Sequence, residues 1–239
     1  MPHNRYYIDA FLQKGTNITL CDEEWHHLVR VLRAQKGDTL ELINGQGQLA
    51  RSIISDLKKH SAELEITQIL EEKPAPSPLI LAQAIPRMNH LEWIIEKGTE
   101  LNATSFWLFP GYLSEKQGLS DSQHTRLEHL KISAMKQCGR LDLPTILLKP
   151  PLLEWTLPQG TLLFGDTIDD APYLWDLPLS IPLPSPVILF IGPEKGFSLK
   201  EREFLIQQLH CTRMRLHPNI LRAETAPLVA LSLIQKFML

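Results

Sequence analysis

From residue 79 onward, short apolar runs alternate with amphipathic stretches, and this pattern constrains the fold more than any other feature of the chain. The apolar runs are expected to form strands at residues 79–85, 105–109, 146–148, 161–164, 187–191 and 213–216. The amphipathic stretches are expected to form helices at residues 91–101, 121–138, 199–209 and 226–237. Such alternation is typical of a parallel sheet covered by helices on both faces. The region is therefore predicted to be an α/β domain.

A proline-rich segment at residues 71–78 precedes this region. Its alternate prolines, Pro74, Pro76 and Pro78, remove backbone donors and favour an extended linker. We therefore expect two domains, at residues 1–72 and 73–239.

The first 72 residues are expected to form a small β-rich barrel or sheet. Strands are predicted at residues 39–43, 48–55 and 62–70. Asn44-Gly45 separates the first two, and this dipeptide favours a hairpin because the turn needs positive φ. A helix is predicted at residues 23–32, with Asp22 as its N-cap.

Composition limits the classes of protein to consider. The 239 residues carry a net charge of −3, so an RNA partner would need a local basic surface. The start of the chain lacks the pattern of a signal peptide, which favours the cytoplasm. Cys21, Cys138 and Cys211 lie far apart without a zinc-type pattern, so we expect buried thiols and no metal.

Two segments are candidates for a ligand site, 191–197 (IGPEKGF) and 219–226 (NILRAETA), because each joins a predicted strand to a predicted helix. In open α/β sheets, ligands bind at the carboxyl ends of strands. Ser198 and Glu201 form a capping-box pattern, and Thr225 is expected to cap the last helix. The alternative for each segment is an ordinary turn, and neither matches a nucleotide phosphate loop.

The two segments together resemble the carboxy-terminal pattern of the ribosomal RNA small subunit methyltransferase E family of the SPOUT superfamily. GPExGFS is followed by ILRxETA at residues 220–226. Further pieces that resemble the family occur in order at residues 27–38, 92–101 and 137–140, so the resemblance covers nearly the whole chain.

The resemblance implies a PUA-like RNA-binding domain, followed by a SPOUT-type parallel sheet with a trefoil knot, in a homodimer. It also implies that S-adenosyl-L-methionine (SAM) donates a methyl group to N3 of a uridine in 16S rRNA of the small ribosomal subunit. The residues expected to bind the cofactor are Phe164, Ile191, Gly192, Glu194, Gly196, Ile220, Leu221 and Ala223.

Methylating a ring nitrogen requires removal of its proton or stabilisation of the resulting anion. Arg222 is expected to stabilise the anion, and Glu224 or Glu194 to position the base or accept the proton. Arg140 is expected to come from the partner subunit. Taken without the resemblance, the spacing of Arg222 and Glu224 favours an ion pair at the start of a helix over a catalytic role.

Basic residues of the first domain are the expected RNA contacts, namely Arg5, Arg30, Arg33 and Lys36. Arg30 and Arg33 are three residues apart, which would place them on one helix face. The alternative is a solvated face balanced by Asp22, Glu23 and Glu24.

The chain departs from the family pattern at three positions. Lys195 and Asn102 stand where family members typically carry Gly, and Lys136 stands where Glu is common. Asn102 is a mild change because Asn tolerates positive φ. Lys195 favours one rival function, a non-catalytic RNA-binding assembly factor. The other rival is a SPOUT methyltransferase that acts on another RNA.

Overall fold

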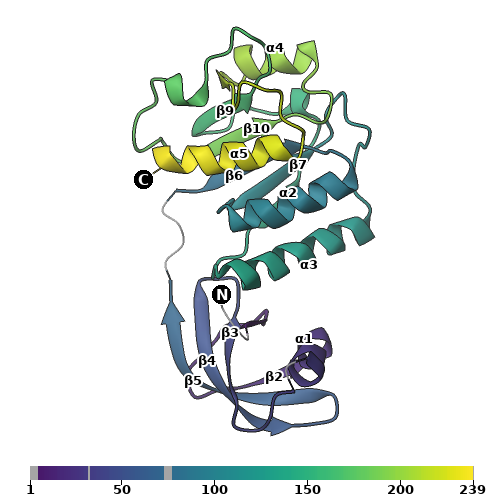
Figure 1. The fold of residues 1–239 in the computed structure, drawn as a ribbon, viewed down its shortest axis with the longest axis vertical. Helices are drawn as coiled ribbons and strands as arrows, with labels where there is room; N and C mark the ends of the chain where they lie inside the picture. The colour runs from purple at the N-terminus through teal and green to yellow at the C-terminus, as the bar shows by residue number, and fades with distance from the viewer. Residues whose placement is uncertain (1–4, 32, 73–76, 239) are drawn as a thin grey trace. The chain divides into compact units, whose positions relative to one another are not determined.

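The computed structural model describes residues 5–31, 33–72 and 77–238, without the side chains of Glu23, Arg30 and Val31. The chain divides into two compact units, Met1–Pro76 with Ile132–Leu143, and Ser77–Lys131 with Pro144–Leu239. Figure 1 shows the elements of each unit along the chain.

The first unit contains a five-stranded sheet with the order β1-β3-β4-β5-β2. Its strands are β1 (Arg5–Tyr7), β2 (Asn17–Cys21), β3 (Thr39–Ile43), β4 (Gln48–Leu57) and β5 (Ser61–Glu71). β1 pairs with β3 in parallel, and the other pairs are antiparallel. The three predicted strands are confirmed, whereas the two edge strands β1 and β2 were not predicted.

The turn between β3 and β4 confirms the predicted hairpin. Gly45 and Gly47 have φ of 71° and 88°, which glycine adopts without steric cost. The Asn44 side-chain oxygen accepts hydrogen bonds from the backbone N–H groups of Gln46 and Gln48, at 2.9 and 3.2 Å. The turn is also tied to a distant segment, since the N–H of Gly47 donates to the carbonyl of Leu141.

The predicted helix of the first unit differs in form. It consists of α1 (Asp22–His26) and a π-helical turn, η1 (His27–Val31). Arg33 follows with a φ of 53°, and the N–H of Ala34 donates back to the carbonyl of Leu28. A left-handed residue ends a helix. Arg33 therefore lies outside the helix, and the prediction that it shares a helix face with Arg30 is wrong.

The second unit is built on a six-stranded parallel sheet, which confirms the predicted fold class. Its strands are β6 (Leu79–Ala84), β7 (Ser105–Phe109), β8 (Thr145–Leu148), β9 (Thr161–Gly165), β10 (Val187–Ile191) and β11 (Thr212–Met214). The order is β11-β9-β10-β6-β7-β8. All six predicted strands are present.

The helices of this sheet are α2 (Met88–Glu100), α3 (Asp121–Cys138), α4 (Leu199–Gln207) and α5 (Thr225–Ile234). Short 3-10 helices occur at η2 (Leu152–Glu154), η3 (Leu174–Asp176) and η4 (Gln235–Phe237). Among the described residues, no helix is long and apolar enough to cross a membrane.

Side chains alternate between two cores, one on each face of the sheet. In β10, Leu189 packs with the residues of α2 and α5, whereas Phe190 packs with Leu205 of α4. Figure 1 shows α5 beside β10 and β6, with α4 above the sheet. Because both faces are covered, the strands are apolar along their length. The carboxyl ends of β9, β10 and β11 are thereby fixed side by side.

The two helix starts behave differently. Ser198 and Glu201 form the predicted capping box at α4. The predicted cap by Thr225 is wrong: Thr225 is already the first residue of α5, and Glu224 before it makes no side-chain cap. The N–H groups of Thr225 and Ala226 instead donate to the carbonyl of Arg222, which satisfies the first donors of the helix.

The cysteines are only partly as expected. Cys211 is buried, and burial raises the pKa of its thiol to about 12. Cys138 is partly buried and Cys21 is exposed, so the prediction of three buried thiols is wrong. Cys21 ends the edge strand β2, where one side of the strand faces solvent.

Candidate functional site

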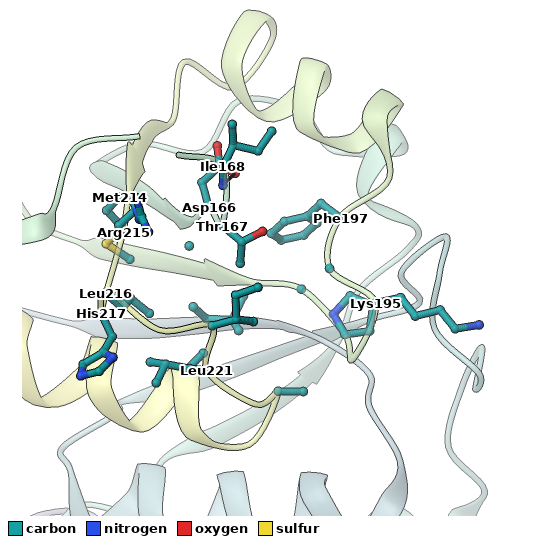
Figure 2. A pocket seen from close by; sticks show the side chains of 18 of the residues that line it. Asp166, Thr167, Ile168, Lys195, Phe197, Met214, Arg215, Leu216, His217 and Leu221 are labelled. Carbon is teal, nitrogen blue, oxygen red and sulfur yellow. Dashed lines mark hydrogen bonds between the residues drawn. The ribbon is translucent and has the colours of Figure 1, made fainter. Parts of the chain in front are cut away.

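A cavity of about 390 Å³ lies at the carboxyl ends of β9, β10 and β11. Its size is within the range of small-molecule sites. Three segments supply most of its wall, 165–168 after β9, 191–197 after β10, and 214–223 at and beyond the end of β11. Figure 2 shows Thr167 and Phe197 directed toward each other across the cavity, with Leu216 and Leu221 on another side.

The loop after β10 folds tightly onto itself. A Cβ atom at Gly192 would lie 3.0 Å from the carbonyl carbon of Gly196 and 3.1 Å from the backbone nitrogen of Phe197. Gly196 has a φ of 71°, and the φ of Lys195 is not positive. The loop can therefore pack this closely only with glycine at position 192, and both Gly192 and Gly196 line the cavity.

Glu194 of this loop is held by two interactions with the start of α2. The backbone N–H of Arg87 donates to its Oε1 at 2.9 Å, and Nδ1 of His90 lies 3.1 Å from the same oxygen. Burial opposes ionisation of Glu194, but these hydrogen bonds outweigh it and lower the pKa of the carboxyl. Glu194 is therefore an ordered carboxylate at neutral pH.

The loop after β11 presents two kinds of side chain. Ile220, Leu221 and Ala223 line the cavity, and Ile220 is 82% exposed. The Arg222 side chain is exposed, and among the described residues none forms a hydrogen bond with its guanidinium. Oε2 of Glu224 is buried without a hydrogen bond and lies 3.6 Å from Nδ1 of His90.

Asp166 is one of the charged residues of the cavity wall. Arg202 of α4 and Arg213 of β11 donate to its carboxylate at 2.9 and 2.8 Å. Burial disfavours its charge, but these hydrogen bonds outweigh the effect and lower the pKa of Asp166. The same carboxylate accepts the N–H of Ile168, which fixes the start of the loop.

The structure brings together most residues predicted to bind a cofactor. Those that line the cavity are Ile191, Gly192, Glu194, Gly196, Ile220, Leu221 and Ala223. Phe164 does not line it and belongs to the buried core shared with α4. Alternation along β9 directs Phe164 into that core and Gly165 to the other face. Gly165, the last residue of β9, and Asp166 beyond the strand line the cavity instead.

Among the predicted catalytic residues, Glu194 and Glu224 lie close together because both face His90. Arg222 is in the same loop as Glu224 but its side chain is exposed. Arg140 belongs to the first unit, where it pairs with Asp142 at 2.5 Å.

The predicted RNA contacts differ in their availability. Arg33 and Lys36 are exposed. Arg5 is engaged by Glu41 at 2.8 Å and by the carbonyl of Gly139 at 2.8 Å. The side chain of Arg30 lies outside the described part of the chain.

Sequence reasoning missed Asp166 and His90. Asp166 follows a predicted strand, so the rule that ligands bind at the carboxyl ends of strands could have identified it. His90 lies in the first turn of α2, more than one hundred residues from both glutamates, and no local pattern indicated its role.

The sequence matches two family models. Residues 73–235 match an RNA methyltransferase domain, and residues 20–67 match an RNA methyltransferase PUA domain. Curated relatives include the ribosomal RNA small subunit methyltransferase E of Synechocystis, 32% identical over 90% of this chain and 71% of that protein. The protein of the same name from Buchnera aphidicola of Schizaphis graminum is 31% identical over 97% of this chain and 95% of its own length.

Two solved structures resemble this chain over nearly its whole length. A methyltransferase of Legionella pneumophila in complex with SAM has a TM-score of 0.87 and 27% identity, covering 97% of this chain and 96% of that one. The ribosomal RNA small subunit methyltransferase E of Neisseria gonorrhoeae, bound to SAM, has a TM-score of 0.84 and 26% identity, covering 98% and 97%.

Proposed function

Because the chain belongs to the ribosomal RNA small subunit methyltransferase E family, we propose that it transfers a methyl group from SAM to N3 of a uridine in 16S rRNA. The observation that carries this proposal is the cavity at the ends of β9, β10 and β11, which the two family-like loops enclose. Two similar solved structures were determined with SAM bound.

The residues of the cavity fit SAM. The tight turn at Gly192 lets backbone groups approach a flat ring, while Ile191, Leu216 and Leu221 offer apolar contact. Asp166 pairs with two arginines, so its own charge is balanced within the wall of the cavity. When bound, SAM would supply an activated methyl group, and the protein would need only to orient it and prepare the uridine.

The protein's own side chains would prepare the base. N3 of uridine carries a proton that must leave before or during methyl transfer, and an ordered carboxylate within reach can accept it. Glu194 and Glu224 are the candidates. The exposed guanidinium of Arg222 is available to stabilise negative charge on a carbonyl oxygen flanking N3. The uridine would have to be turned out of any stack to reach the cavity.

The first unit, which contains the matched PUA domain at residues 20–67, is proposed to bind the rRNA. Arg33 and Lys36 are exposed and suited to phosphate contact. Arg5 is better suited to holding β1 against β3, because Glu41 of β3 already pairs with it. We further propose a cytoplasmic homodimer in which Arg140 is contributed by the partner subunit. The trefoil knot implied by the family stays a prediction.

The backbone at Lys195 weakens one rival function. A lysine in place of the family glycine would favour a non-catalytic assembly factor if that position needed positive φ. Lys195 does not have positive φ, whereas Gly196 does. The lysine therefore leaves the loop free to form the cavity, and Figure 2 shows its side chain extending away from the cavity.

Methyl transfer to purified 30S subunits by an Arg222→Ala variant tests the proposed role of Arg222. We expect SAM affinity within about twofold of the wild type, and turnover lower by about a hundredfold, the usual effect of removing an anion-stabilising donor. Arg126→Ala is the matched control, because Arg126 is an exposed arginine of α3 that pairs with Glu92. Near-normal turnover would contradict the role of Arg222.

Two further measurements test the reaction itself. Calorimetry should show SAM binding to the wild-type chain, and its absence would favour the assembly-factor function. Mapping methylated bases in rRNA from cells that lack the protein should show loss of one N3-methylated uridine in 16S rRNA. Loss of a methyl group from another RNA would instead favour the rival methyltransferase.

A further inference from the structure

His90 contacts both the loop after β10 and the loop after β11. Its Nδ1 atom lies 3.1 Å from Oε1 of Glu194 and 3.6 Å from Oε2 of Glu224. Glu194 belongs to the loop after β10 and Glu224 to the loop after β11. His90 itself lies on a third element, the first turn of α2. One imidazole nitrogen therefore faces a carboxylate from each loop.

The carboxylate of Glu224 depends on this histidine. Its Oε2 atom is buried and accepts no hydrogen bond. Burying such an oxygen costs free energy unless an opposite charge is near. Among the ion pairs of the described residues, His90 is the only basic side chain within 4.0 Å of Glu224. A protonated imidazole would offset the charges of both glutamates, whereas a neutral one can donate at Nδ1 to only one of them.

The other cations nearby are engaged with a different carboxylate. The guanidinium of Arg87 donates two hydrogen bonds to Glu115, at 2.9 and 2.7 Å. Lys195 also interacts electrostatically with Glu115 and helps to lower the pKa of that carboxyl, after the larger effect of Arg87. Neither cation forms an ion pair with Glu224 in the described part of the structure. His90 is therefore the side chain that faces the buried carboxylate of Glu224.

We propose that the side chain of His90 is a positioning group that connects the loop of Glu194 to the loop of Glu224 and so shapes the cavity before a ligand binds. His90 acts through the two glutamates and is not itself among the residues that line the cavity. The identity of the ligand rests on the proposed function, but the tie between the loops does not.

Three variants separate this role from a merely structural one. His90→Gln keeps a polar side chain of similar reach but cannot become a cation. His90→Arg keeps a positive charge at every pH of interest. His129→Gln is the matched control, because His129 is an exposed histidine of α3. Thermal unfolding of all three variants checks that each is folded before it is compared.

Hydrogen exchange of the ligand-free full chain tests the tie directly. We expect amides in residues 192–197 and 220–226 to exchange severalfold faster in His90→Gln than in the wild type. Exchange in His90→Arg and His129→Gln should stay close to the wild type. Unchanged exchange of either loop in a folded His90→Gln variant would overturn the proposal, because both loops must loosen if one group ties them.

Calorimetry with SAM supplies a second readout. We expect the affinity of His90→Gln for SAM to be about tenfold lower than that of the wild type, within the usual range of coupling between two sites. The affinities of His90→Arg and His129→Gln should stay close to the wild-type value. Equal affinity in the wild type and His90→Gln would contradict the role of His90. If the wild type bound no SAM, the proposed function would fail, while the exchange experiment would still decide the role of His90.

Discussion

Arg213 of β11 donates a 2.8 Å hydrogen bond from Nε to the carboxylate of Asp166, the residue that follows β9. Arg202 of α4 donates to the same carboxylate at 2.9 Å. The side chain of Asp166 is only 2% exposed. Its carboxylate therefore links the end of β9 to β11 and to α4 at the wall of the cavity. Removing its charge should affect both stability and the shape of the cavity.

Asp166→Asn keeps the size of the side chain but leaves the partly buried Arg202 without its counter-ion and removes one of the two carboxylates that pair with Arg213. We expect the free energy of unfolding to fall by about 2 kcal/mol, since breaking such a network is among the larger single-residue effects. Urea unfolding measures this change. Asp170→Asn is the control, because Asp170 pairs with Arg213 but is mostly exposed. Equal midpoints for the two variants would refute a special role for Asp166.

The lowered pKa of Asp166 gives a second prediction, on pH. Its folded-state pKa lies below the value of about 3.9 expected in an unfolded chain. The carboxylate therefore contributes stability that is fully present above about pH 5 and is lost as the pH falls through its folded-state pKa. Urea unfolding at several pH values should show the difference between the wild type and Asp166→Asn shrinking from pH 5 toward pH 3. A difference that is constant over this range would contradict the assignment.

Gly192→Ala should impair ligand binding more than folding. The added Cβ would meet the backbone of Gly196 and Phe197 at 3.0 to 3.1 Å, and backbone atoms can yield only if the loop shifts. We expect SAM affinity, measured by calorimetry, to fall by at least about tenfold, equivalent to about 1.4 kcal/mol. Gly118→Ala is the control, because a Cβ there meets nothing within 4 Å. Wild-type affinity in Gly192→Ala would show that the cavity does not depend on this close approach.

Lys195→Gly tests whether the departure from the family pattern matters. Because the φ of Lys195 is not positive, glycine relieves no backbone strain at this position. We expect SAM affinity within about threefold of the wild type, with any change due to the greater freedom of the glycine loop. A gain of a hundredfold by calorimetry would instead mean that lysine had weakened the site.

The sequence predicted the regular parts of the second unit well because they rest on local patterns. Apolar runs identified all six strands of the parallel sheet, and Ser198 with Glu201 correctly indicated the start of α4. Asn102 has a φ of 63°, as expected for an asparagine in place of glycine. The short edge strands β1 and β2 were missed, since so few residues establish no alternation.

The candidate site was predicted in outline, because its two loops follow strands. Features that depend on tertiary structure were not. Alternation in β9 directs Phe164 into the core, and Asp166 reaches the cavity because it lies beyond the end of the strand. Only the folded chain places His90 between Glu194 and Glu224. Arg33, with its left-handed backbone, lies outside the helix, so the spacing of Arg30 and Arg33 did not indicate a shared helix face.

The assignment of Ile132–Leu143 to the first unit has a consequence for dissecting the protein. Met135 and Leu141 from that segment complete a small apolar cluster with Ile43 and Leu49, and Leu141 also accepts the hydrogen bond of the Gly47 turn. A gene fragment that stops at residue 72 would lack these partners and expose part of its own interior. The amino-terminal unit therefore cannot be transferred to another protein as one continuous segment of the gene. A fusion would also have to include residues 132–143, which are encoded some sixty codons downstream of residue 72.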